Sequence, residues 1–322
     1  MQRIALKLLS VLGCLCLAAS LPVHAEGATG VGIAHIKVSD PISGGPMPGY
    51  VFYPAIRQSK HATIIGPYAI AASFGAPAIA GTKPLVVISH GHGGSNLGHH
   101  DLAEYLASHG FIVATIEHPK DNFHDTSGNG QPEVMAGRPL QIKATISRLL
   151  ADPRWAKLVD ANRIGVAGFS AGGYTSLLLV GAVPRFDRFI GYCDRHPQDR
   201  EICELVKQLG AADTKQTLAT LQKKFQALGP TDDPRVKAAF VMAPQSIVFD
   251  KPGLEKIKRP VFLYYGENDH VLLPRENALR IAPLIRTLSA LRAVPKAGHY
   301  VFLAPCSEQL ASEAPAICRD PA

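Results

Sequence analysis

Short, unbroken apolar segments alternate with helical segments from residue 84 onward. The apolar segments are residues 85–89, 111–116, 163–168, 236–242, 261–265 and a last short one at 291–294, and the helical patterns are residues 102–108, 141–151, 171–180 and 276–288. A strand that is apolar along its whole length needs cover on both faces, which is typical of a parallel sheet between two helical layers. The alternation therefore predicts an α/β fold with a mostly parallel, doubly wound sheet.

Two stretches depart from this alternation. Residues 26–80 are rich in glycine, proline and alanine, and their β-branched pieces at 33–38 and 50–53 predict an antiparallel hairpin or ribbon instead of a separate domain. Between residues 183 and 234 the alternation stops, and two helical patterns occupy the gap. An insertion at this point lies above the carboxyl ends of the strands. We therefore expect one domain over residues 26–322, with a small helical cap at about residues 184–234.

The N-terminal segment has the pattern of an export signal. Arg3 and Lys7 accompany an apolar run that extends to about residue 21, and the small residue Ala25 follows. This pattern predicts a signal peptide over residues 1–25 and a periplasmic or secreted protein. A retained membrane anchor is the alternative, for which the run is short. No later stretch approaches the roughly 18 to 20 apolar residues of a membrane span, so none is expected after cleavage.

Four cysteines follow the signal segment: Cys193, Cys203, Cys306 and Cys318. An even number in an oxidising compartment predicts two disulfides, and closeness in sequence favours Cys193–Cys203 and Cys306–Cys318 among the three possible pairings. Four free thiols are the alternative. A zinc site is disfavoured because the chain has no Cys-x-x-Cys spacing among these residues.

The formal net charge of +7 is dispersed along the chain, without a long basic run or interleaved aromatic residues. This distribution does not support a nucleic-acid partner. The sequence does not predict the oligomeric state.

The strongest local signal is the pattern Gly168-Phe169-Ser170-Ala171-Gly172. It lies directly between a predicted strand and a predicted helix, where flanking glycines allow a sharp turn that exposes the serine hydroxyl at the edge of the sheet. This context predicts that Ser170 is a nucleophile. A glycine-rich packing turn is the alternative interpretation.

A serine hydroxyl needs a base to take its proton and a carboxylate to orient that base. In this arrangement the acid and then the histidine follow the serine along the chain. His299, in the loop after the last predicted strand, is the predicted base, and Asp269, in the loop after residues 261–265, is the predicted acid. Glu267 is the competing acid, and His270 is expected to be a pocket-wall or surface residue.

Acyl transfer also needs N–H donors for the oxyanion. The backbone N–H of Ala171 is one candidate, and the N–H of His92, in the glycine-rich turn that follows residues 85–89, is the other. A metal site is the alternative explanation for His90, His92, His99 and His100. Metal sites need supporting carboxylates or cysteines, and the turn has an independent explanation, so no metal is expected.

The chain resembles the α/β-hydrolase superfamily, and within it the exported "predicted dienelactone hydrolase" group that is similar to platelet-activating factor acetylhydrolases. The stretches that carry the resemblance are PLVVISHGHGGS, LASHGFIVATIEHP, ANRIGVAGFSAGGY, RPVFLYYGENDH and AGHYVFL, with GPYAIAA as a lead-in. The resemblance implies a cofactor-independent serine hydrolase of small carboxylic esters with Ser170, Asp269 and His299 as its triad. True dienelactone hydrolases use a cysteine nucleophile, so Ser170 departs from the pattern behind the group's name.

The motifs predict the chemistry better than the substrate, because one fold serves many substrates. A peptidase or a lipid hydrolase with the same triad is the alternative within enzymes. An inactive binding protein of this fold is the alternative outside them, and it predicts a missing triad residue.

Overall fold

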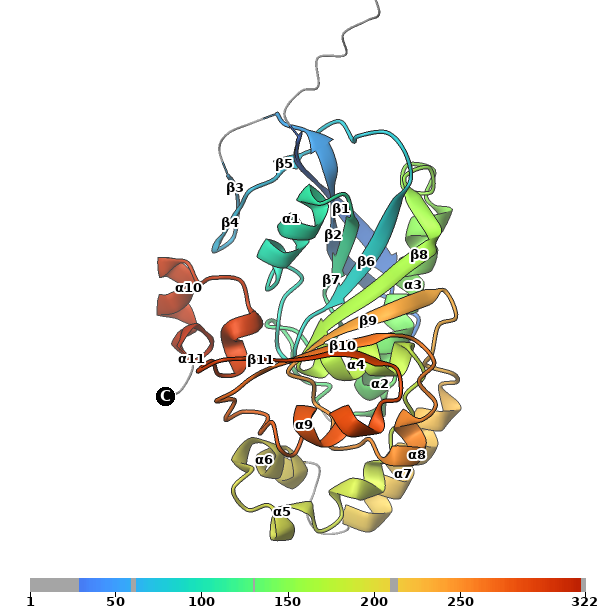
Figure 1. The fold of residues 1–322 in the computed structure, drawn as a ribbon, viewed down its shortest axis with the longest axis vertical. Helices are drawn as coiled ribbons and strands as arrows, with labels where there is room; N and C mark the ends of the chain where they lie inside the picture. The colour runs from blue at the N-terminus through green and yellow to red at the C-terminus, as the bar shows by residue number, and fades with distance from the viewer. Residues whose placement is uncertain (1–28, 59–61, 130, 209–213, 320–322) are drawn as a thin grey trace, which may run out of the picture.

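A nine-stranded mixed sheet forms the centre of the molecule (Figure 1). The computed structural model describes residues 29–58, 62–129, 131–208 and 214–319. The predicted signal peptide therefore lies outside the described residues. The strand order is β11-β10-β9-β8-β6-β7-β2-β1-β5, and a separate two-stranded ladder joins β3 (Thr63–Ile65) to β4 (Tyr68–Ile70).

Six neighbouring strands of the sheet are parallel, as the alternation predicts. The strand β7 shows why, because all five of its residues are buried. Val113 packs in one core cluster, whereas Ile112 and Ala114 pack in the other. The parallel strands are β6 (Lys83–Ser89), β7 (Ile112–Ile116), β8 (Val159–Phe169), β9 (Val236–Met242), β10 (Val261–Gly266) and β11 (Leu288–Val294).

The N-terminal hairpin extends this sheet on one side. β1 (Thr29–Ser39) pairs antiparallel with β2 (Pro46–Ile56) along eleven residue pairs, and β2 pairs antiparallel with β7. The two-residue strand β5 (Ser73–Phe74) pairs parallel with β1 at the edge. The predicted hairpin is therefore confirmed, and it belongs to the main sheet.

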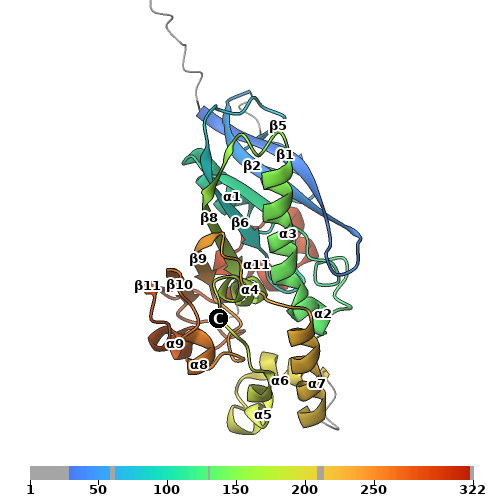
Figure 2. The ribbon, with the colours of Figure 1, turned by 90° about the vertical axis from the view of Figure 1, so that its right-hand side faces the viewer.

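Helices cover both faces. The helix α1 (His100–Ser108) packs on one face through Ala103 and Ala107, whereas α3 (Gly137–Ala151) and α4 (Ala171–Leu179) pack on the other, as Figure 2 shows. Within the described ranges, no helix is both long and apolar enough to cross a membrane. The remaining short helices near the sheet are α2 (Pro132–Met135), α8 (Lys251–Leu254), α9 (Ala278–Ile281) and the 3-10 turns Ala282–Leu284 and His299–Phe302.

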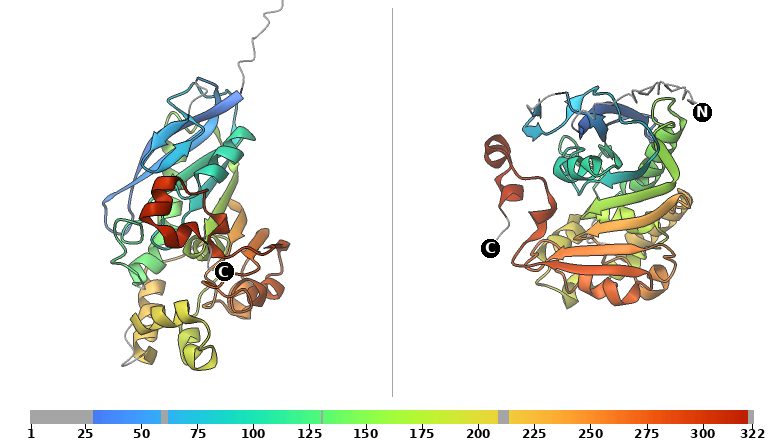
Figure 3. Two further views of the ribbon diagram at one scale, coloured as in Figure 1. Left: turned by 90° about the vertical axis from the view of Figure 1, so that its left-hand side faces the viewer. Right: turned by 45° about the horizontal axis from the view of Figure 1, so that its top comes forward.

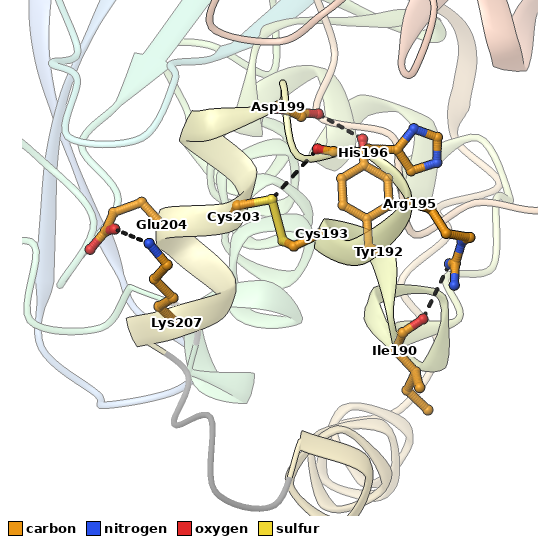
Figure 4. The surroundings of a disulfide bond; sticks show 9 residues. All are labelled: Ile190, Tyr192, Cys193, Arg195, His196, Asp199, Cys203, Glu204 and Lys207. Carbon is orange, nitrogen blue, oxygen red and sulfur yellow. Dashed lines mark hydrogen bonds and ion pairs between the residues drawn. A yellow bond between two sulfur atoms is a disulfide. The ribbon is translucent and has the colours of Figure 1, made fainter.

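The segment predicted as a cap forms a group of helices at one end of the molecule, at the bottom of Figure 1. A disulfide joins Cys193 to Cys203 with their Cα atoms 5.5 Å apart, and Tyr192 Oη donates a 2.6 Å hydrogen bond to Asp199 beside it (Figure 4). The predicted pairing is thus present. The helices are the 3-10 helix Phe186–Phe189, α5 (Tyr192–Arg195), α6 (Arg200–Gln208) and α7 (Thr214–Ala227).

The C-terminal segment, dark red in Figure 3 (left), lies apart from these helices. It contains α10 (Glu308–Glu313) and α11 (Pro315–Cys318). The second predicted disulfide, Cys306–Cys318, closes the segment with a Cα–Cα distance of 5.8 Å.

The helix predicted at residues 276–288 is shorter than expected. It ends at Ile281, a 3-10 turn that contains Pro283 follows, and β11 already begins at Leu288. Proline lacks the N–H that an interior helix position donates, so the α-helix cannot continue through residue 283.

Candidate active site

The predicted turn at Ser170 is present, with its backbone in a strained conformation. β8 ends at Phe169 and α4 begins at Ala171, so Ser170 is the single residue between them. Its φ of 55° and ψ of −115° are unusual for a residue with a side chain, and such a conformation costs on the order of 1–3 kcal/mol. The Ser170 N–H donates to the Met242 carbonyl at 2.9 Å, which ties the turn to the end of β9. The surrounding structure therefore holds the serine in place.

The glycines of the motif let three backbone segments touch. A Cβ at residue 168 would overlap the carbonyl of Gly172, and a Cβ at residue 172 would overlap the carbonyl of Ser89. The end of β8, the start of α4 and the end of β6 are therefore in direct contact. This contact brings the turn after β6 against Ser170.

Asp269 and His299 form a buried pair. Asp269 follows β10 and His299 follows β11, and these parallel neighbours bring their carboxyl ends to the same edge of the sheet. His299 Nδ1 and Asp269 Oδ2 are 2.7 Å apart, and the two side chains are 2% and 1% exposed. Asp269 Oδ1 accepts the N–H groups of Val271 and Leu272. The carboxylate is thus fixed, and it orients the imidazole.

The pair lies beside the serine turn. The His299 ring contacts the ring of Phe169, the residue before Ser170, with centroids 4.6 Å apart. Among the described residues, no hydrogen bond joins Ser170 Oγ to the ring of His299. The predicted base therefore packs against the residue that precedes the predicted nucleophile.

Two other residues of the loop that carries Asp269, Glu267 and His270, are both exposed. Glu267 is exposed, and its Oε2 accepts the Lys296 N–H at 3.0 Å, which is a loop-closing contact. His270 is also exposed, which matches the surface role expected for it.

The turn after β6 adjoins Ser170 as predicted. A Cβ built on Gly91 would lie 3.4 Å from the Cβ of Ser170, and Gly93 adopts a positive φ of 61°. Ala171 is the first residue of α4, where a backbone N–H has no acceptor within the helix. His92 and Ala171, the two residues predicted to supply oxyanion donors, line the same cavity as Ser170.

An ion-pair network that the sequence analysis missed supports this turn. Arg138, at the start of α3, is buried, and its Nη1 donates to Asp121 Oδ2 at 2.5 Å. Its Nη2 donates to the carbonyl of His90, and the other oxygen of Asp121 is hydrogen-bonded to His92 Nδ1. Burial alone would raise the pKa of Asp121, but the charge of Arg138 and the hydrogen bond from His92 lower it to about 2. The carboxylate is therefore ionised at neutral pH and holds the imidazole of His92.

Two neutral histidines lie beneath the turn. Burial lowers the pKa of His90 to about 3, and the nearby charge of Arg138 contributes in the same direction. His90 Nε2 accepts the N–H of His118, and His118 Nε2 lies 2.9 Å from Ser89 Oγ. Burial also lowers the pKa of His118 well below its usual value. The turn is thus built on uncharged imidazoles near neutral pH.

Ser170 opens into a cavity of about 290 Å³. Its polar wall includes Ser170, Ala171, His92 and Gln245, and the side chain of His92 is 45% exposed. Its apolar wall comes from α2, the predicted cap and the loop after β10, through Val134, Met135, Phe186, Phe189, Ile202, Leu221 and Leu272. The insertion thus supplies much of the cavity that the serine faces.

The four histidines weighed as a metal site point to different partners. His99 Nδ1 bonds the carbonyl of Phe302, and His100 Nδ1 bonds Glu104. His90 and His92 bond Gly91 and Asp121, respectively. In the ranges that the structure describes, no cluster of three or more histidine, cysteine or acidic side chains has the arrangement of a metal site.

The sheet order, the strand–turn–helix at Ser170 and the loops that carry Asp269 and His299 define an α/β-hydrolase fold. A solved structure of a ferulic acid esterase from Streptomyces cinnamoneus has the same fold, with a TM-score of 0.56. It shares 21% sequence identity, and the alignment covers 92% of this chain and 82% of that one. The predicted fold class is therefore confirmed.

Two sequence comparisons agree with this class. The family model of platelet-activating factor acetylhydrolase, isoform II, matches residues 55–134, a stretch that contains the turn at His92 and none of the three triad candidates. Acylamino-acid-releasing enzyme 2 of Oryza sativa subsp. japonica is 24% identical over 217 residues, or 63% of this chain. The chain spans a quarter of the length of that relative.

Proposed function

We propose that this chain is a serine hydrolase that cleaves carboxylic esters through an acyl-enzyme intermediate. The observation that carries the proposal is the strained Ser170 turn, which opens into a cavity and lies beside the buried Asp269–His299 pair. A nucleophile, an oriented base and a cavity that can hold the substrate are the parts that acyl transfer needs.

In the proposed reaction, His299 accepts the hydroxyl proton while Ser170 Oγ attacks the ester carbonyl. Asp269 stabilises the imidazolium that forms, and the N–H groups of His92 and Ala171 bind the oxyanion. His299 then gives its proton to the leaving alcohol. Water releases the acyl group by the same sequence, with His299 again as the base, and no cofactor takes part.

The cavity favours small acyl groups. Its volume of about 290 Å³ is at the lower end of ligand sites, which typically extend from about 300 to 1,000 Å³. Its mostly apolar wall suits a short hydrocarbon or aromatic acyl group. This size is the argument against a long-chain lipid as the preferred substrate.

The substitution Ser170→Ala tests the proposal. We expect it to abolish hydrolysis of p-nitrophenyl acetate and butyrate, and labelling by a fluorophosphonate, because no other group forms the acyl-enzyme. Circular dichroism and the urea midpoint should show that the variant is folded. Retained turnover would contradict the role of Ser170, whereas a wild-type protein that is not labelled and hydrolyses neither ester would favour a binding protein.

An amide substrate is the second candidate, because the rice relative is named for the release of acylated amino acids. The same preparation should be assayed with an N-acetyl amino acid p-nitroanilide beside the matching p-nitrophenyl ester. We expect the ester to be preferred. A higher kcat/KM for the anilide would reverse the assignment and keep the triad.

A further inference from the structure

A second, smaller cavity of about 90 Å³ adjoins the turn that carries His92. The C-terminal segment forms one wall through Leu310 and Ile317, and Leu303 lies next to them. Phe169 and the turn glycines form the opposite wall. The Cys306–Cys318 disulfide closes the segment that covers this cavity.

One residue in the lining of this cavity has a polar atom without a partner. His99 lines the cavity and is 2% exposed, and its Nε2 is a buried atom without a hydrogen-bond partner. Its Nδ1 lies 2.8 Å from the carbonyl of Phe302, which can only accept, so Nδ1 carries the proton. Leaving such an atom unpaired costs about 1–3 kcal/mol unless a ligand or water satisfies it.

The protonation state of His99 determines whether the missing partner of Nε2 donates or accepts a hydrogen bond. Burial lowers the pKa of His99, and the bond to Phe302 offsets this effect only in part. The neutral ring protonated at Nδ1 presents a lone pair at Nε2. The missing partner must therefore be a donor, such as a hydroxyl group.

The cavity adjoins residues that contact the predicted base and the predicted nucleophile. His299 gives its proton to the departing alcohol, and its ring contacts those of Phe169 and Tyr300, which both line the small cavity. Gly91 also lines it and is next to Ser170. Among the residues that the structure describes, only His92 lines both this cavity and the larger one.

We propose that the small cavity is a subsite for the leaving alcohol, in which His99 Nε2 accepts a hydrogen bond from a second hydroxyl of that alcohol. This inference rests on the proposed ester hydrolysis. The acyl group then occupies the larger cavity. The favoured substrates are esters of short diols or triols, because the small cavity admits only a short chain and offers one acceptor within largely apolar walls.

Two esters that differ in one group measure this preference. In 2-hydroxyethyl butyrate and n-propyl butyrate, a hydroxyl replaces a methyl of similar size and the acyl group is the same. We expect kcat/KM of the wild type to be about three- to tenfold higher for the hydroxyethyl ester, the range for one net hydrogen bond.

The substitution His99→Asn isolates the acceptor. The Asn side-chain amide can still donate to Phe302, but no atom replaces Nε2. We expect the preference to disappear, so that kcat/KM for 2-hydroxyethyl butyrate becomes equal to that for n-propyl butyrate. His100→Asn is the matched control, because His100 is the adjacent buried histidine and does not line this cavity. It should retain the wild-type preference.

A second variant covers the case in which His99→Asn is unfolded. Ile317→Trp fills the cavity from a helix without buried residues, so the fold should tolerate it. It should lower hydrolysis of the hydroxyethyl ester relative to methyl butyrate at least fivefold. Equal rates for the hydroxyethyl and propyl esters in the wild type, or a preference that survives both variants, would overturn the subsite and leave the esterase intact. Failure to hydrolyse any of the three esters would overturn both proposals.

Discussion

Two helical segments, each closed by one disulfide, lie on different sides of Ser170 and differ in how they are held. The insertion contributes Phe186, Phe189 and Phe225 to the main core, all at most 5% exposed. The helices α10 and α11 of the C-terminal segment contain no buried residue. The first segment is therefore part of the core, whereas the second is a surface flap held largely by its covalent link.

Two segments can therefore both cover the candidate site and still differ in local stability. A segment that shares the main core opens only when much of the domain unfolds, but a segment with few buried contacts opens locally. The larger cavity should therefore keep its shape under conditions in which the smaller one is already open.

Phe186→Ala should give the largest effect. Phe186 is fully buried and packs against Phe225, with ring centroids 5.4 Å apart, so its truncation should lower the free energy of unfolding by about 3–5 kcal/mol. Leu310→Ala, in α10, is the control and should cost less than about 1 kcal/mol. Urea unfolding followed by circular dichroism measures both, and equal losses would remove the distinction between the segments.

The next largest effect on stability should come from removing the disulfides one at a time. The loops span 10 and 12 residues, so chain entropy alone assigns about 3 kcal/mol to either bond. We expect Cys193→Ser with Cys203→Ser to lower global stability by about that amount. Cys306→Ser with Cys318→Ser should change it by less than about 1 kcal/mol, because the flap detaches without unfolding the core.

Limited proteolysis should show the opposite order under native conditions. The variant that lacks the C-terminal disulfide should be cleaved rapidly within residues 305–319, and the variant that lacks the insertion disulfide should resist cleavage there. A large global loss from the C-terminal pair would mean that α10 and α11 belong to the cooperative core.

Acid should destabilise the turn after β6, which lines both cavities. The folded state keeps His90 neutral with a pKa of about 3, whereas the unfolded chain takes up a proton near pH 6.5. This contribution is complete above pH 6.5 and is lost as the pH falls toward 3. Between pH 7 and pH 5, the shifted pKa of His90 alone should lower the free energy of unfolding by about 2 kcal/mol.

Urea unfolding at the two pH values measures this decrease in stability. His109→Gln removes an exposed histidine and should leave it unchanged, and equal stability at both pH values would contradict a buried neutral His90.

The sheet and the loops of the candidate site could be predicted from the sequence because the information is local. Unbroken apolar runs mark strands such as β7, and the glycines around Ser170 mark its turn. The order of Asp269 and His299 along the chain then followed from the fold class. The disulfide pairs were also predictable, since each joins cysteines close in sequence.

The contacts that were missed are non-local and involve residue types that are usually exposed. Arg138 and Asp121 are 17 residues apart, and nothing in either neighbourhood shows that both side chains are buried. One weak signal existed, because Arg138 lies near the start of a mostly buried helix. The unpaired nitrogen of His99 depends on Phe302, 203 residues away, and no local pattern contains it.

The glycines at 168 and 172 lead to a statement about how this chain can change over time. Because side chains there would collide with backbone carbonyls, natural variation should preserve both glycines for packing alone. The serine between them is free of that constraint. If Ser170 is the nucleophile, as we propose, a descendant without that activity would keep the glycines and replace Ser170. The two glycines then mark the fold, and the serine marks the proposed chemistry.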